Sequence, residues 1–137
     1  MFLFSEKLTF WWPVKVLEPD PDNAGTKIEG EFEALFELID PDEQKAAAGE
    51  RLAILKQITP DLDEAKLDAL QKQLDAHDLK TMRRALKGWR GIGKTATEEL
   101  PFNEANFKRV YRHVRYRNAL TRAYLDATND DKARLGN

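Results

Sequence analysis

Two segments near the beginning of the chain alternate between apolar and polar residues, and a turn-rich stretch joins them. The first segment is residues 8–17. In an extended strand, one face of this segment carries the apolar side chains of Leu8, Phe10, Trp12, Val14 and Val16. Residues 26–36 alternate in the same way, and residues 18–25 contain Pro19, Pro21 and Gly25. The pattern predicts a β-hairpin with arms at about 8–17 and 26–36. Because a lone hairpin is marginally stable in water, its apolar face must pack on helices or pair with another chain.

Pro13 interrupts the first arm. Because proline has no N–H to donate to a neighbouring strand, we expect this arm to lie at a sheet edge or to bulge there. Trp11 falls on the face opposite Phe10 and Trp12, which makes it a candidate contact for a partner.

The rest of the chain has helical periodicity. A first helix is predicted to start at Asp40, with Pro41 at its first position and Glu43 completing a capping box, and to end near Thr59. A second helix is expected from Thr59 or Asp61. A third, basic segment continues the helical rhythm to an end at Gly88 or Gly91, through Leu79, Met82, Leu86 and Trp89.

The last part of the chain begins with another cap. Asn103 can cap a helix, and Phe102 before it can pack on Phe107 one turn later. The apolar stripes that follow fit either one long helix or two short ones jointed near Arg115. We predict an α+β fold, an N-terminal β-hairpin followed by a bundle of about four to five α-helices. A chain of 137 residues suits one domain, with the hairpin at about 8–36, the helical part at about 40–128 and a frayed tail at about 129–137.

The charge of the chain is unevenly distributed. Residues 1–79 carry 8 basic and 18 acidic side chains, whereas residues 80–137 carry 14 basic and 6 acidic ones. Either the two halves face and partly neutralise each other, or the basic half serves a partner. A basic run with interleaved tyrosines could follow a phosphate backbone, through Lys108, Arg109, Arg112, Arg115, Arg117 and Arg122. The low isoelectric point of about 5.8 argues against nucleic acid.

Few residues could carry chemistry. The chain has no cysteine, its two histidines (His77 and His113) are far apart, and Ser5 is its only serine. We therefore expect no metal site and no acyl-transfer triad. No run approaches the ~20 apolar residues that cross a bilayer, and no signal peptide is recognisable. The expectation is a cytoplasmic protein that is not an enzyme and has no catalytic residue, metal or cofactor.

Residues 88–95 read GWRGIGKT and match the phosphate-binding pattern GxxxxGK[ST]. That site requires a strand leading into the loop and a helix leaving it. Here the predicted lead-in is helical, and only a few residues separate Thr95 from Pro101. We interpret the glycines as the end of a helix and Trp89 as a core residue, and we expect no nucleotide affinity.

The order of these features resembles the tail assembly chaperones of long-tailed bacteriophages. The resemblance rests on FWWPVKV at 10–16, KIEGEFEALF at 27–36, GWRG at 88–91, LPFNEAN at 100–106 and ALTRAYLDA at 119–127. It implies a protein that binds the tape measure protein in the cytoplasm of the bacterial host and helps the tail tube to polymerise. The tail tube protein and a second copy of the chain are further partners to consider.

The candidate partner contacts are Trp11, Arg112, Arg115 and Tyr116. Two alternatives to the chaperone stay open. One is a small nucleic-acid-binding protein that uses the basic second half, and the other is a structural tail or connector component. Salt dependence separates the chaperone from the nucleic-acid-binding protein, because binding to DNA weakens steeply with salt and binding in an apolar groove does not.

Overall fold

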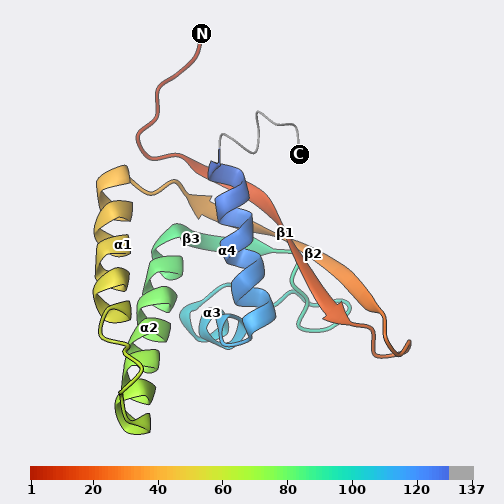
Figure 1. The fold of residues 1–137 in the computed structure, drawn as a ribbon. Coiled ribbons are helices and arrows are strands. Elements are labelled where there is room, and N and C mark those ends of the chain that lie inside the picture. Colours follow the sequence, from red (N-terminus) through yellow and green to blue (C-terminus); the bar gives the residue numbers. More distant parts are fainter. Residues whose placement is uncertain (130–137) are drawn as a thin grey trace.

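A three-stranded antiparallel sheet organises residues 1–129, the part of the chain that the computed structural model describes. Its strands are β1 (Thr9–Pro19), β2 (Lys27–Glu37) and β3 (Leu86–Arg90), with β2 in the centre. Four helices complete the described part of the chain (Figure 1). The predicted α+β class is confirmed.

The predicted hairpin is confirmed, with each arm shifted by one or two residues. β1 and β2 pair without a break from Thr9 opposite Glu37 to Pro19 opposite Lys27. The turn between them closes through the Asp20 side chain, which accepts from the backbone N–H of Asp22 at 2.9 Å. Gly25 adopts a φ of 79°, which glycine reaches without a steric penalty.

Pro13 lies in an edge strand, as predicted. Two residues further on, the outward-facing carbonyl of Lys15 accepts a hydrogen bond from Arg122 at 2.9 Å. Residues two apart in a strand present their backbone groups to the same side, so the missing N–H of Pro13 also faces away from β2. The proline therefore costs the hairpin no ladder bond.

The prediction of a helix through Leu86 and Trp89 is wrong. The helix α2 (Glu64–Ala85) runs directly into β3, which pairs with β2 through Trp89 opposite Ala34. The register slips beside Phe36, where β2 and β3 accommodate an irregularity. The arrangement is thus a three-stranded sheet with helices packed on it, instead of a two-stranded hairpin followed by a helical bundle.

The helix α1 (Pro41–Leu55) starts as predicted and ends four residues early. Asp40 caps it by accepting from the backbone N–H of Asp42 at 3.0 Å, whereas Glu43 pairs with Arg84 instead of closing a capping box. The second and third predicted helices form a single helix, α2. It is capped by Asp63 and continues unbroken for 22 residues.

The C-terminal part contains two helices, α3 (Glu104–Tyr111) and α4 (Val114–Thr128), so the second of the two open alternatives holds. Asn103 caps α3 by accepting from the N–H of Asn106 at 2.8 Å. The expected contact between Phe102 and Phe107 is present, with ring centroids 6.4 Å apart. Apart from Asn129, the predicted frayed tail lies outside the described residues.

The helices cover one face of the sheet. The inward-facing side chains of all three strands are buried together with those of α2, α3 and α4, and the largest without solvent exposure are Phe36, Phe107, Leu86, Leu120 and Val14. The opposite face carries Trp11, Lys15 and Glu31, all of them exposed. In Figure 1, α1 lies beside α2 and away from the hairpin. Within residues 1–129, no helix has the length and apolar character needed to span a membrane.

Trp89 should contribute strongly to stability, as the sequence predicted, although it does so from a strand. Its side chain is 7% exposed, its Nε1–H donates to the Leu100 carbonyl at 2.7 Å, and its ring meets Phe102 edge-on. Trp89→Ala should lower the free energy of unfolding by about 3–5 kcal/mol in urea melts. Trp11→Ala is the control, with an expected loss on the order of 1 kcal/mol. A loss below about 1 kcal/mol for Trp89→Ala would contradict the assignment.

Candidate functional site

The helix α1 buries none of its 15 residues. Leu52 and Leu55, which continue its apolar pattern, are 50% and 38% exposed. Three consecutive alanines, Ala46, Ala47 and Ala48, occupy its middle turn. These short side chains do not fill the space between α1 and the other helices, and α1 packs mainly on α2.

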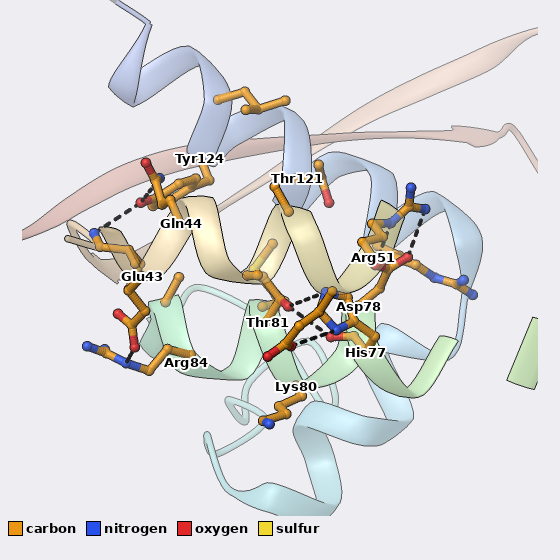
Figure 2. Close-up of a pocket in the computed structure, with 18 of the residues that line it drawn as sticks. Glu43, Gln44, Arg51, His77, Asp78, Lys80, Thr81, Arg84, Thr121 and Tyr124 are labelled. Atoms are coloured by element: carbon orange, nitrogen blue, oxygen red, sulfur yellow. Dashed lines mark hydrogen bonds and ion pairs between the residues drawn. The ribbon is translucent and has the colours of Figure 1, made fainter. Parts of the chain in front are cut away.

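An open groove of about 710 Å³ lies between α1, α2 and α4. This volume falls in the range of ligand-binding pockets, about 300–1,000 Å³. The apolar and aromatic part of its lining consists of Ile39, Ala46, Ala47, Ala48, Met82, Ala85, Tyr111, Tyr124 and Leu125. Thr81 on α2 and Thr121 on α4 also line the groove, and both remain exposed, so the groove is open to solvent (Figure 2). We refer to this surface as the helical groove.

Polar contacts between α1 and its neighbours form the rim of the helical groove (Figure 2). Arg51 makes two hydrogen bonds to the Asp78 carboxylate, at 2.9 and 3.2 Å, and Glu43 accepts from Arg84 at 2.9 Å. Hydrogen bonds from Arg84 to Glu37 and then to Glu43 raise the pKa of Arg84. Exposed ion pairs contribute about 0–1 kcal/mol each, so α1 is held by weak interactions.

Two further contacts hold α1 along the same rim. His77 lies 3.6 Å from the Glu50 carboxylate, and the side chain of Gln44 donates to the hydroxyl of Tyr124 at 3.2 Å. That hydroxyl also accepts from the backbone N–H of Ile39, at 3.2 Å. Tyr124 therefore joins α4 both to the segment before α1 and to the first turn of α1.

Tyr111 forms the polar end of the helical groove. Its side chain is 6% exposed, and its hydroxyl donates to the Asp78 carbonyl at 3.2 Å. Burial, reinforced by the Asp78 carboxylate, raises the pKa of Tyr111 to about 12. The Arg117 guanidinium lies 5.5 Å from the centre of its ring.

The candidate contacts predicted from the sequence lie outside the helical groove. Arg115 bonds to the Glu18 carboxylate at 2.6 Å, and the Tyr116 hydroxyl donates to the same carboxylate at 3.3 Å. The structure thus brings these two residues together. Trp11 lies on the uncovered face of the sheet beneath Arg90, 3.9 Å from its guanidinium, and Arg112 follows the last residue of α3.

The acidic and basic halves of the chain contact each other through several ion pairs. Four arginines from residues 80–137 bind carboxylates from residues 1–79, namely Arg84, Arg90, Arg115 and Arg117. The carboxylates belong to Glu37 and Glu43, Glu33, Glu18 and Asp75 respectively. The acidic and basic halves of the chain therefore partly neutralise each other.

The loop that matches the phosphate-binding pattern closes on itself. β3 leads into it, so the predicted helical lead-in is wrong, but the next helix starts only at Glu104. The backbone N–H groups of Lys94 and Thr95 both donate to the Glu98 carbonyl, at 2.7 and 3.2 Å. A phosphate cradle needs such N–H groups to point at the ligand. Within residues 1–129, no group of three or more potential metal ligands gathers.

The weak attachment of α1 should be visible in hydrogen exchange. Elements with few buried apolar contacts open locally, below the free energy of global unfolding. We expect Arg51→Gln to accelerate exchange of the α1 amides by up to about fivefold, as the loss of ~1 kcal/mol implies, and to leave α4 unchanged. Lys45→Gln on the same helix is the control, because Lys45 makes no ion pair within the described residues. Equal protection of α1 and α4 in all variants would contradict the weak attachment.

Tyr111 should make the protein less stable at alkaline pH. Its pKa is raised from 10.0 to about 12 in the folded state, so the unfolded chain loses this proton first as the pH rises. The contribution of protonated Tyr111 to the free energy of unfolding is complete below about pH 10 and is lost between about pH 10 and 12. Tyr111→Phe cannot titrate, so its free energy of unfolding should fall less between about pH 9 and 11 in urea melts. If the free energy of unfolding fell equally with pH in the two proteins, burial would not raise the pKa of Tyr111.

Comparison with known proteins adds no relative to this description. No family model, no curated protein and no solved structure matches the chain.

Proposed function

We propose that this protein is a non-enzymatic tail assembly chaperone. In this role it binds a helical segment of the tape measure protein in the cytoplasm of a bacterial host and so helps the tail tube to polymerise. The tail tube protein is a second partner in the same proposal. The observation that carries the binding role is the open helical groove.

The helical groove suits a helix better than an extended peptide. Three helices supply its walls, and its lining residues recur at helical spacing on each wall, such as His77, Thr81 and Ala85 on α2. An amphipathic helix can lay its apolar face in such a groove and leave its polar face to the solvent. The charged rim, formed by Arg51, Asp78, Glu43 and Arg84, then lies beside the polar edges of the bound helix.

The loose packing of α1 supports the same role. A tape measure protein is a very long, helix-rich chain, so its carrier must accept helices that differ in side-chain size. Because α1 is held by exposed ion pairs and one tyrosine hydroxyl, it can shift at little cost in free energy. The resemblance of the sequence pattern names the partner, and the groove supplies a surface that fits it.

The proposal can be tested by filling the helical groove. Thr81 is exposed and lines it, so Thr81→Trp should occupy the space without disturbing the core. In co-expression with the tape measure protein, the unmodified chain should keep that protein soluble and co-purify with it. Thr81→Trp should weaken the complex by on the order of tenfold or more. Gln73→Trp, at an exposed position of α2 that does not line the groove, should bind normally.

Salt separates the proposal from its alternatives. The complex should survive about 0.5 M salt, where exposed charge pairs are largely screened. An insoluble tape measure protein, together with steeply salt-dependent binding of duplex DNA, would favour the nucleic-acid alternative. Failure to bind either partner would favour a structural tail component. Equal binding by Thr81→Trp and Gln73→Trp would place the binding site elsewhere on the chaperone.

A further inference from the structure

The segment before β1 exposes a run of apolar side chains. The side chains of three consecutive residues, Phe2, Leu3 and Phe4, are 92%, 78% and 80% exposed. Isolated exposed apolar residues are ordinary, but a continuous exposed run marks a surface that binds something. Residues 1–7 extend away from the fold beside the start of α1 (Figure 1).

This segment leaves the fold at the mouth of the helical groove. The carbonyl of Leu8 accepts from the backbone N–H of Leu38 at 2.7 Å. The next residue, Ile39, lines the groove and donates its backbone N–H to the Tyr124 hydroxyl. Leu8 is thus anchored one residue away from the groove lining, and residues 1–7 are tethered there.

The segment is long enough to run along the groove. Seven extended residues span at most about 25 Å. The 15 residues of α1, which form one wall, measure about 22 Å along the helix axis. Phe2, Leu3 and Phe4 are therefore within reach of the lining alanines of α1 from the anchor at Leu8.

We propose that residues 1–7 form an intramolecular strap that occupies the helical groove and competes with the partner for it. The three apolar side chains of the strap lie in the groove in the closed arrangement, and Glu6 and Lys7 stay at its charged mouth. The structure shows the open arrangement, which leaves the groove accessible. The competition rests on the proposed function, whereas occupancy of the groove by the strap does not.

Disulfide crosslinking tests occupancy directly, because the chain has no cysteine of its own. Leu3→Cys is combined with Thr121→Cys, which lines the groove, or with Arg122→Cys as the matched control. Residue 122 is adjacent on α4 but does not line the groove. Under mild oxidation at low protein concentration, the pair with Thr121→Cys should form an intramolecular disulfide several-fold faster than the control. Equal rates, or disulfides between two molecules, would overturn the strap.

Binding of the co-expressed tape measure protein tests the competition. The full-length variant with Leu3→Cys and Thr121→Cys should bind it when reduced and lose most of this binding when oxidised. In a second full-length variant, Phe2→Ser with Phe4→Ser, binding should be tighter than in the unmodified chain. Unchanged binding after oxidation, or after the two serine substitutions, would overturn the competition. If the reduced protein fails to bind, the proposed function fails, and the crosslinking rates alone then decide whether the strap exists.

Discussion

The aromatic contacts of Phe36 hold the three strands and α4 in one arrangement. Phe36 has no solvent exposure and stands opposite Phe10 of β1 and Leu86 of β3. Its ring lies 5.9 Å from that of Phe10 and meets Tyr124 of α4 edge-on, with centroids 5.4 Å apart. Truncating Phe36 would leave a cavity between the sheet and α4. The position of α4 on the sheet follows from this cluster.

The same cluster determines where the helical groove opens. Tyr124 uses its ring to pack on Phe36 and its hydroxyl to bind Ile39 and Gln44, at the start of α1. The inner face of the sheet is already covered by α2, α3 and α4, so α1 packs mainly on α2. Interiors are normally close-packed, and alanines at the middle of α1 prevent this here. The groove is therefore a consequence of how the core is filled.

Local signals predicted the hairpin and the helix caps. The alternation around Val14 and Phe32, the turn before Gly25 and the caps Asp40 and Asn103 all act within a few residues. β3 had no such signal, because the spacing of Leu79, Met82 and Leu86 fits a helix and no turn residue separates Ala85 from Leu86. Pairing with β2, some fifty residues earlier in the chain, overrides the local preference.

The helical groove could not be predicted from the sequence for a related reason. Its walls come from three helices that are distant in the sequence, and the composition of α1 alone indicates a helix with an apolar stripe. Leu52 and Leu55 do lie in this helix, but the packing of α1 on α2 leaves them 50% and 38% exposed. Aromatic and basic side chains on the surface were no guide to the groove, because Arg115 and Tyr116 bind Glu18 of the same chain.

Stability and binding are assigned to different parts of this molecule. The side chains that hold the fold, such as Phe36, Phe107 and Leu120, are buried away from the helical groove. On α1 the groove is lined by small alanines and ion-paired side chains, which contribute little to the free energy of unfolding, whereas its wall on α2 includes the core residues Met82 and Ala85. On the proposed function, this separation lets α1 adjust to each helix that enters while the sheet and α4 keep their arrangement. A carrier for a long chain of varied helices needs that combination, because a groove whose walls all came from core residues could not change shape without loosening the fold.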